Sequence, residues 1–438
     1  MPITLVALMA AACSSTGSTQ GASAPSTIAP GSPWLGTLAA VTLPPPVNSL
    51  TSLDCVSSFR CWAVGSTIGG AGAPNGAAVI ATDNGGATWT VETTPPTVGY
   101  LSAISCSDRH HCTAVGQAAQ TSNGQGAIIT TADGGATWVS AVVPSGVLDV
   151  TAIACQANRR CLATATTILG TAVLVASPAQ PAWAQRGTLP PTFTGATGIS
   201  CPDAQHCWVT AHVAVDVDHV AGQIAVSTNG GTTWAATAAP KGAGYLNDIV
   251  CARGSGGNGR LPFTSTTGSS TTLPTTTPSS NTPSGTTSGT AAPTTTVPPA
   301  TTAPPPSTTT TTAPAGVPEA WCVAVGTSAT TVTGTRSGHG IILTTVNGGA
   351  GWTSQPVAPR AAALVGVSCT AVNSCVAVGS AVALEPQAGV MVLTGASGHP
   401  WKKAAAVSSA QALTAVSCTS ASRCVMVGES ISQHLTGA

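Results

Sequence analysis

The stretch LSAISCSDRHHCTAVG, residues 101–116, holds the pattern that decides the fold of this chain. Apolar and small polar residues alternate up to Cys106, which predicts a half-buried β-strand. A short polar gap follows, and a second strand begins at Cys112. Apolar runs at 126–131 and 139–143 complete four short strands, and no segment of this unit has helical periodicity.

The cysteine pair recurs along the chain with nearly constant spacing. Six of the seven pairs have five residues between their cysteines, and the first cysteines of the first five pairs lie 46 to 51 residues apart. The pairs are Cys55/Cys61, Cys106/Cys112, Cys155/Cys161, Cys201/Cys207, Cys251/Cys322, Cys369/Cys375 and Cys418/Cys424. A period near fifty with four strands per unit predicts an all-β chain, a seven-bladed β-propeller of four-stranded blades.

These pairs are interpreted as seven local disulfides rather than metal ligands. Structural zinc sites favour gaps of two to four residues with further ligands nearby, which the five-residue gaps do not provide. Disulfides persist only in oxidising compartments, so the pattern also predicts an exported protein. Each short loop is expected to contribute roughly 2 kcal/mol of stability.

A second motif, Thr131-Ala-Asp133-Gly-Gly135-Ala-Thr137-Trp138, follows the third strand of the same unit. Its Asp is expected to fold back onto the turn backbone, its Gly to supply a positive φ, and its Trp to fill the space between sheets. The three other copies are Thr82/Asn84/Gly86/Trp89, Ser227/Asn229/Gly231/Trp234 and Thr345/Asn347/Gly349/Trp352, and decayed copies end at Trp183 and Trp401.

This motif resembles the Asp-box (BNR) repeat of sialidase-like propellers. The resemblance covers the repeats and implies the propeller fold, with the boxes away from any active site. Sialidases also need an arginine triad, whose first member lies in an Arg-Ile-Pro segment, and this chain has no such segment. The repeats are similar, too, to noncatalytic seven-bladed propellers typified by the photosystem II assembly factor. Its arginine-rich patch is absent here, so its role is not carried over.

Closure of the ring requires segments from both ends of the chain. The last unit stops after the strand at Cys424 and has no box or Trp. Residues 27–42, which contain Trp34, have the outline of a decayed box and an outer strand. We therefore expect the N-terminal strand to join the C-terminal strands in a composite closing blade, which would leave no free sheet edge.

The chain divides into five segments. Residues 1–13 resemble a bacterial lipoprotein signal with Cys13 as the acylated residue, although Ala10 stands where Leu is usual and no basic residue precedes the apolar run. An ordinary cleaved signal is the alternative.

Residues 14–33 are expected to form a flexible tether. The propeller then takes residues 34–252 and 319–438, and the Thr/Pro/Ser-rich insertion 253–318 between them is expected to be one long disordered loop. It resembles glycosylated stalks of actinobacterial wall proteins; an unmodified spacer is equally compatible.

Charge is scarce: 6% of residues are charged and the formal net charge is zero. This excludes the basic surface of a nucleic-acid-binding protein and leaves contact with a membrane only through a lipid anchor. No P-loop, dinucleotide fingerprint or Ser/His/Asp order is present, and neither a cofactor nor a metal is expected. Asp216-Val-Asp218-His219 is the one metal-like cluster, but it lacks further ligands.

Polar side chains remain on the face opposite the cysteine tips, where propellers usually bind ligands. The predicted ligand-face residues are Asp149, Asp216, Asp218, His219, Tyr245, Asp248, Arg336, His339, Arg360, Glu385 and Glu429. The sequence predicts a monomeric, noncatalytic extracytoplasmic propeller that binds a partner protein or a cell-envelope glycan. The alternative is a glycoside hydrolase, sialidase-like or glucanase-like, that uses carboxylates of this face.

Overall fold

The structure is a computed structural model of the 438-residue chain, and part of the chain is described. The described residues are 5–11, 37–68, 75–119, 125–193, 195–214, 220–237, 242–253, 320–328, 339–357, 361–371, 374–381, 390–395, 401–407, 410–421 and 423–430. They belong to one compact unit, Met1–Thr264 with Thr312–Ala438. The expected disordered loop 253–318 lies outside the described residues except for Arg253, as do Cys13 and the expected tether 14–33.

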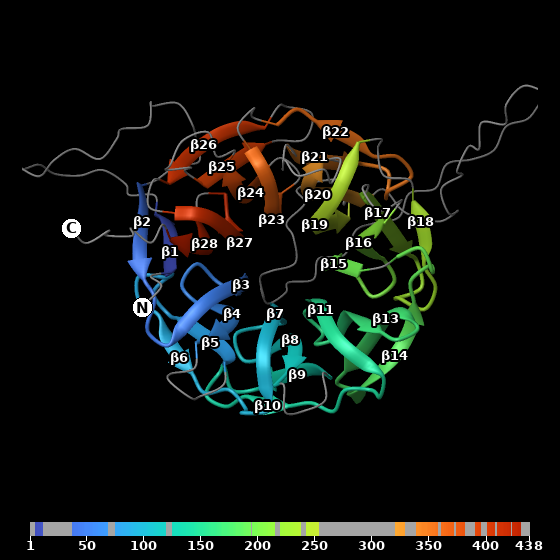
Figure 1. The fold of residues 1–438 in the computed structure, drawn as a ribbon, viewed down its shortest axis with the longest axis horizontal. Coiled ribbons are helices and arrows are strands. Elements are labelled where there is room, and N and C mark those ends of the chain that lie inside the picture. Colours follow the sequence, from blue (N-terminus) through green and yellow to red (C-terminus); the bar gives the residue numbers. More distant parts are fainter. Residues whose placement is uncertain are drawn as a thin grey trace, which may run out of the picture. The chain divides into compact units, whose positions relative to one another are not determined.

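The described residues are all-β and contain seven four-stranded antiparallel sheets and no helix. In six of the sheets the strands follow chain order from the innermost to the outermost (Figure 1). The first three sheets are β3 (Val47–Cys55), β4 (Cys61–Thr67), β5 (Gly76–Thr82) and β6 (Thr90–Glu92); β7 (Val98–Cys106), β8 (Cys112–Ala118), β9 (Gly126–Thr131) and β10 (Val139–Ser140); and β11 (Val147–Cys155), β12 (Cys161–Thr167), β13 (Gly170–Ser177) and β14 (Gln180–Thr188). The next three are β15 (Gly195–Ser200), β16 (Cys207–Ala214), β17 (Val220–Ser227) and β18 (Ala235–Thr237); β19 (Ala243–Arg253), β20 (Ala320–Ser328), β21 (Gly340–Thr345) and β22 (Thr353–Gln355); and β23 (Ala361–Ala371), β24 (Ser374–Ala381), β25 (Val390–Gly395) and β26 (Lys402–Val407).

The remaining sheet combines both ends of the chain. Its order is β27 (Ala410–Ser420), β28 (Arg423–Ser430), β1 (Leu5–Ala11) and β2 (Thr37–Thr42). The strand β1 lies between β28 and β2, with Leu8 opposite Met426 on one side and Ala40 on the other. From its sequence, this apolar run is predicted to belong to an export signal. The two assignments exclude each other in a mature protein, because cleavage before Cys13 would remove β1.

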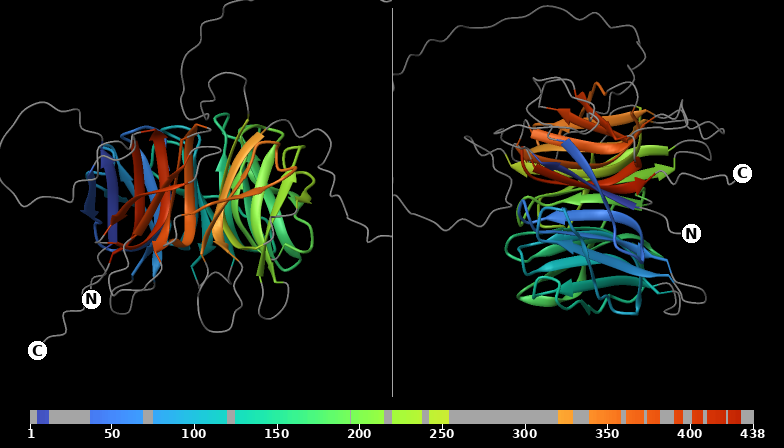
Figure 2. Two further views of the ribbon diagram at one scale, coloured as in Figure 1. Left: turned by 90° about the horizontal axis from the view of Figure 1, so that it is seen from above. Right: turned by 90° about the vertical axis from the view of Figure 1, so that its left-hand side faces the viewer.

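The apolar core lies between neighbouring sheets. One cluster, for example, joins Trp62 and Val79 of the first sheet to Leu101 and Ile104 of the second. Alternating strands bury one set of side chains against the preceding sheet and the other set against the following sheet. The sheets are therefore arranged side by side around a centre, with β3, β7, β11, β15, β19, β23 and β27 innermost (Figures 1 and 2).

The Ala-Val-Gly sequence after the second cysteine has a steric cause. A Cβ atom at Gly116 of β8 would lie 2.1 Å from the carbonyl oxygen of Tyr100 in β7, and one at Gly326 would lie 1.9 Å from that of Tyr245. The inner strand is bulged at this point, since its register shifts between Val98 and Tyr100. Only glycine permits the inner strand to approach so closely.

The seven predicted disulfides are all present and join nearest neighbours. They lie at the ends of the inner hairpins, on the side that we call the cysteine face. We call the opposite side, where the inner strands begin, the loop face. Seven disulfides indicate a compartment that keeps thiols oxidised, such as the cell exterior. Within the described residues, no helix is long and apolar enough to cross a membrane.

The strands that carry Cys369 and Cys375 extend past their disulfide, as do those that carry Cys418 and Cys424. Cys369 and Cys375 are buried, and their Cα atoms lie 4.0 Å apart. Beyond them the ladder continues to the pair Ala371 and Ser374, after a register shift, so the strands of this sheet run past the disulfide. The Cys375 Sγ also lies 4.0 Å from the carbonyl oxygen of Ala371. The sequence predicts a plain polar tip between these cysteines, whereas the structure extends both strands into it.

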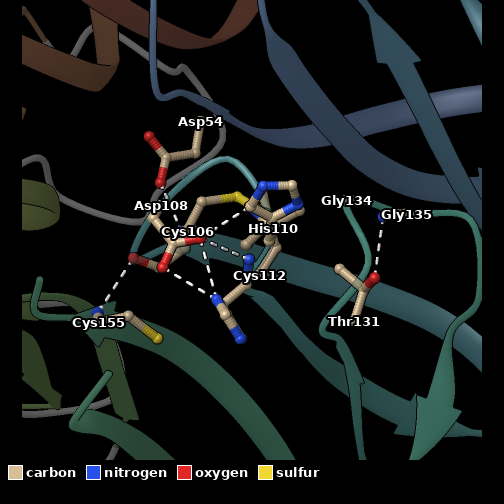
Figure 3. The surroundings of a disulfide bond; sticks show 12 residues. Asp54, Cys106, Asp108, His110, Cys112, Thr131, Gly134, Gly135 and Cys155 are labelled. Atoms are coloured by element: carbon tan, nitrogen blue, oxygen red, sulfur yellow. Dashed lines mark hydrogen bonds and ion pairs between the residues drawn. A yellow bond between two sulfur atoms is a disulfide. The ribbon is translucent and has the colours of Figure 1, made fainter. Parts of the chain in front are cut away.

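Four turns, which we call the box turns, join the third and fourth strands on the cysteine face: Thr82–Trp89, Thr131–Trp138, Ser227–Trp234 and Thr345–Trp352. In the second of these the backbone N–H of Thr137 donates to Asp133 Oδ1 at 2.9 Å. The N–H of Gly135 donates to the Thr131 hydroxyl at 2.8 Å, as Figure 3 shows. Asn84, Asn229 and Asn347 accept the equivalent of the first hydrogen bond in the other turns.

The glycine of each box motif has the expected positive φ but is also buried, which the sequence does not predict. The φ values of Gly86, Gly135, Gly231 and Gly349 lie between 87° and 92°. The N–H of Gly86 donates to the Thr82 hydroxyl at 2.9 Å, and that of Gly349 donates to the Thr345 hydroxyl at 3.1 Å. A Cβ atom at Gly349 would lie 3.3 Å from the Trp208 indole nitrogen of the preceding sheet. These glycines therefore fix the turn and its packing, and they are not accessible to a ligand.

All four box turns are fixed to the disulfide hairpin of their own sheet. The N–H of Gly134 donates to the carbonyl oxygen of His110 at 3.0 Å. The equivalent bonds run from Gly85 to Phe59 and from Gly230 to Gln205 at 2.8 Å, and from Gly348 to Ala320 at 2.9 Å. The two motifs that the sequence repeats are therefore parts of one hydrogen-bonded structure on the cysteine face. The residues that differ from one sheet to another therefore lie on the loop face and at the centre of the ring.

Candidate functional site

The inner strands of all seven sheets enclose a central cavity of about 590 Å³. Its wall is formed by the last residues of each inner strand before the first cysteine, such as 51–55 and 102–106. Hydroxyl groups line much of this wall, and most of them are hydrogen-bonded to a neighbouring sheet. The Thr51 hydroxyl donates to the carbonyl oxygen of Leu101 at 2.8 Å, and the Thr414 hydroxyl donates to that of Leu50 at 2.8 Å.

A second set of hydrogen bonds runs closer to the disulfides. The backbone N–H of Cys155 donates to the Ser105 hydroxyl at 3.0 Å, and three further cysteines donate to the equivalent Ser200, Ser368 and Ser417. Asp54 takes this position in the first sheet, where its Oδ2 accepts from Cys106 N–H at 2.7 Å (Figure 3). The polar wall therefore serves first to hold neighbouring sheets together.

Two half-buried carboxylates belong to this wall. Burial raises the pKa of Asp54 to about 6, against the opposing effect of the backbone N–H groups of Cys106 and Cys55. Burial likewise raises the pKa of Asp248 to about 6, against the N–H groups of Val367 and Ile249.

The position of Asp248 corrects a prediction. From the sequence it is expected to face a ligand on the loop face. The structure instead places it between β19 and β23, with Oδ2 accepting from Val367 N–H at 2.9 Å and Oδ1 from Ile249 N–H at 2.8 Å. Both carboxylate oxygens are thus engaged by backbone, which makes Asp248 a link between sheets.

Tyr100 and Asp149 lie near the beginnings of β7 and β11, at the loop face, and the charge of Asp149 acts on the Tyr100 phenol. Burial raises the pKa of the Tyr100 phenol, and the Asp149 charge raises it further. Burial also raises the pKa of Asp149, opposed by hydrogen bonds from Val150 N–H and the Gln117 side chain. Asp149 Oδ1 is buried and has no hydrogen-bond partner among the described residues. The pair therefore combines a partly exposed phenol with a partly buried carboxylate whose pKa is raised.

Tyr245 forms a second pair on the same face, with His212 of β16. The two rings are tilted at 55° with their centroids 5.0 Å apart. Gly195 lies opposite His212 in the β15–β16 ladder, and a Cβ atom there would lie 3.3 Å from the imidazole ring. Burial lowers the pKa of His212, so the neutral imidazole is favoured at neutral pH. The side chain of Tyr245 remains 45% exposed.

Tyr100, Asp149 and Tyr245 occupy one position of the repeat. Each lies six residues before the first cysteine of its pair, where Ser49, Gly195, Ala363 and Ala412 stand in the other sheets. The inner strands bring these positions to the same end of the ring. Sequence reasoning finds Asp149 and Tyr245 but misses Tyr100 and His212. Alignment of the repeats on their cysteines would have identified Tyr100, whereas His212 lies on a different strand and has no such signal.

Several predicted ligand-face residues cannot be placed. Asp216, Asp218, His219, Arg336, Arg360 and Glu385 lie outside the described residues, as does the side chain of Glu429. His339 is described and exposed; its backbone N–H donates to the Ser328 hydroxyl at 3.0 Å before β21 begins. Within the described parts of the chain, no three His, Cys, Asp or Glu side chains are grouped as a metal site would require.

Comparisons with known proteins give similarity of structure but no family. No protein family and no curated protein matches this chain. Similar solved structures include YCF48 bound to D1 peptide, with 11% identity and a TM-score of 0.49 over 89% of this chain and 95% of that chain. They also include the GH74 xyloglucanase from Xanthomonas campestris, with 11% identity and a TM-score of 0.47 over 81% of this chain and 46% of that chain. The GH74 enzyme of Niastella koreensis has 12% identity and a TM-score of 0.39 over 87% of this chain and 55% of that chain. At these identities and TM-scores, none of them assigns an activity or a partner.

Proposed function

We propose that this chain is an exported, noncatalytic seven-bladed β-propeller that binds a partner protein or a cell-envelope glycan on its loop face. In this proposal the sheet of β27, β28, β1 and β2 closes the ring. The observation that carries the proposal is the placement of Tyr100 and Tyr245 at one repeat position, both partly exposed and each beside a polar group.

The chemistry of these pairs suits binding. Tyrosine presents a large flat apolar surface with a polar tip, loses little side-chain entropy when it is covered, and is enriched in the cores of interfaces. The partly buried carboxylate of Asp149 places a negative charge near Tyr100, and His212 packs against the Tyr245 ring. Flat rings flanked by fixed polar groups suit both the apolar faces of sugars and the side chains of a protein partner.

The carboxylates of the cavity wall favour binding over hydrolysis. Glycoside hydrolysis requires two carboxyl groups that face the scissile bond. Asp54 and Asp248, however, accept backbone N–H groups of neighbouring sheets. The runner-up function, a glycoside hydrolase, is favoured by Asp149 alone, because a carboxyl group with a raised pKa can act as a general acid.

A glycan array and a pull-down from envelope extract would identify the ligand, and isothermal titration would then quantify it. We expect Tyr100→Ala and Tyr245→Ala each to weaken binding about tenfold or more, in the range of interface hot spots. Phe59→Ala is the matched control, since Phe59 is an exposed aromatic residue of the cysteine face. Equal loss in all three variants would contradict the proposed site. Turnover of a glycan that Asp149→Asn abolishes would establish the hydrolase instead.

A further inference from the structure

Three arginines, Arg60, Arg160 and Arg423, directly precede the second cysteine of a pair. Two of them, Arg60 and Arg160, make the same contact at a junction between sheets. Each reaches the box turn of the following sheet: Arg60 Nη2 donates to the carbonyl oxygen of Gly134, and Arg160 Nη2 donates to that of Gly230 at 2.7 Å. The two junctions therefore share one backbone contact and differ only in what surrounds the guanidinium group.

At the Arg60 junction, acidic groups surround the guanidinium. Asp83 forms an ion pair with Nη1, and Glu92 Oε1 lies 3.8 Å from Nη2. The indole N–H of Trp138 donates to Glu92 Oε2 at 2.7 Å, which holds this carboxyl group in place. Burial raises the pKa of Glu92 to about 7, opposed by Trp138 and by the Arg60 charge, so Glu92 is mostly ionised at pH 8.

At the Arg160 junction, the ladder position of Glu92 is taken by a glycine: Glu92 lies opposite Val79, and Gly187 lies opposite the equivalent Val173. Arg186 is the extra residue of a bulge directly before Gly187. The indole N–H of Trp234, which corresponds to that of Trp138, donates to the carbonyl oxygen of Gly231 at 3.1 Å instead of to an acid.

The backbone of β14 brings Arg186 to the same box turn as Arg160. A Cβ atom on Gly187, the next residue, would lie 2.5 Å from the carbonyl oxygen of Gly231 and 2.6 Å from that of Thr232. β14 therefore lies directly against the turn whose Gly230 accepts from Arg160. Arg186 itself is exposed, so the junction is open to solvent on its outer side.

In the part of the chain that the structure describes, no carboxylate forms an ion pair with Arg160 or Arg186. Arg160 Nη1 is buried and has no hydrogen-bond partner among the described residues. Burial lowers the pKa of Arg160, and the charge of Arg186 lowers it further. A buried donor without a partner and two neighbouring like charges both cost stability. An oxyanion would relieve both costs, because guanidinium groups bind carboxylate and phosphate through charge-assisted, bidentate hydrogen bonds.

We propose that Arg160 and Arg186 form an oxyanion-binding site beside the box turn Ser227–Trp234, which takes a phosphate or carboxylate group of a ligand. The site lies on the cysteine face and is independent of the tyrosine pairs of the loop face. At the Arg60 junction, Asp83 and Glu92 of the protein itself supply the compensating charge, whereas at the Arg160 junction a ligand would supply it.

The test is isothermal titration of the full chain at pH 8 and constant ionic strength, with inorganic phosphate and with glucuronate as separate probes. We expect saturable binding of at least one probe, which also distinguishes phosphate from carboxylate recognition. Arg186→Glu, which places an acid beside Arg160, and Arg186→Gln should each raise the Kd at least tenfold. Glu92→Gln is the matched control at the other junction and should leave the Kd unchanged.

Thermal unfolding gives a second readout. Without added anion, Arg186→Glu should unfold at a higher temperature than the parent chain, because it removes the repulsion at Arg160. Phosphate or glucuronate should raise the unfolding temperature of the parent chain and leave that of Arg186→Glu unchanged. Absence of binding by both probes, or the same Kd in the parent and Arg186→Glu, would overturn the proposal.

Discussion

Asp54 Oδ2 lies 2.7 Å from the backbone nitrogen of Cys106, so a carboxyl group of one sheet holds the disulfide hairpin of the next. Four other sheets use a serine hydroxyl at the equivalent position, with distances of 2.9 to 3.1 Å to the cysteine nitrogen. The hydrogen bond is thus common to the repeat, whereas the titratable group is particular to this junction. This difference leads to a prediction about pH.

The first prediction concerns Asp54→Ser. Because the folded pKa of about 6 exceeds the ordinary value of 3.8, the folded state binds the proton more tightly. The contribution of Asp54 to stability is therefore full below about pH 4 and is lost as pH rises through 6. We expect the parent chain to lose on the order of 1–2 kcal/mol more than the variant between pH 4 and pH 8, since partial exposure of the carboxyl group reduces the effect. Denaturant unfolding at both pH values measures this, and equal losses would show that Asp54 is ordinarily solvated.

The second prediction compares two glycines with positive φ. Gly135 has a φ of 92° and a Cβ atom there would lie 2.3 Å from Glu92 Oε1, whereas Gly146 has a φ of 82° and open space around it. Gly146→Ala should cost about 1–2 kcal/mol from backbone strain alone. Gly135→Ala should cost more, because the Glu92 carboxyl group must also move. Thermal unfolding of both variants decides this, and a smaller loss at Gly135 would contradict the described packing.

The third prediction concerns the disulfide that spans the insertion. Cys251 and Cys322 are 71 residues apart, whereas Cys106 and Cys112 are 6 apart. The chain-entropy estimate gives roughly 4 kcal/mol for the long loop and roughly 2 kcal/mol for the short one, so replacing the first pair by serine should cost more. Joining Ala252 to Glu319 should leave the unfolding temperature equal or higher and should remove this difference. Aggregation of the shortened chain would mean that the insertion is part of the packed structure.

The fourth prediction addresses the N-terminal segment. A chain that begins at Cys13 lacks β1, which pairs with both β2 and β28. We expect it to unfold at a lower temperature than the full chain, whereas removal of residues 1–3 alone, which precede β1, should have little effect. Equal unfolding temperatures for all three chains would show that β1 does not stabilise the closing sheet, which would leave this segment available as an export signal.

Local sequence determined much of this protein. Residues close in the chain make the disulfide from Cys106 to Cys112 and the turn in which Asp133 accepts from Thr137, so their spacing alone predicts both. The strand pattern and the period of about fifty residues likewise predicted the four-stranded sheets. These features depend on contacts within one unit, which repeat wherever the unit does.

Tertiary structure decided what lies between the units. The sequence predicts that Asp248 is a carboxylate available to a ligand. In the structure, β23 packs against β19, and the N–H of Val367, 119 residues away, donates to the Asp248 carboxylate. The pairing of Tyr245 with His212 and the meeting of Arg160 with a box turn 70 residues further along also arise only when neighbouring sheets pack. A repeat pattern specifies each sheet, but the environment of a polar side chain depends on the adjacent sheet, whose residues lie far away in the sequence.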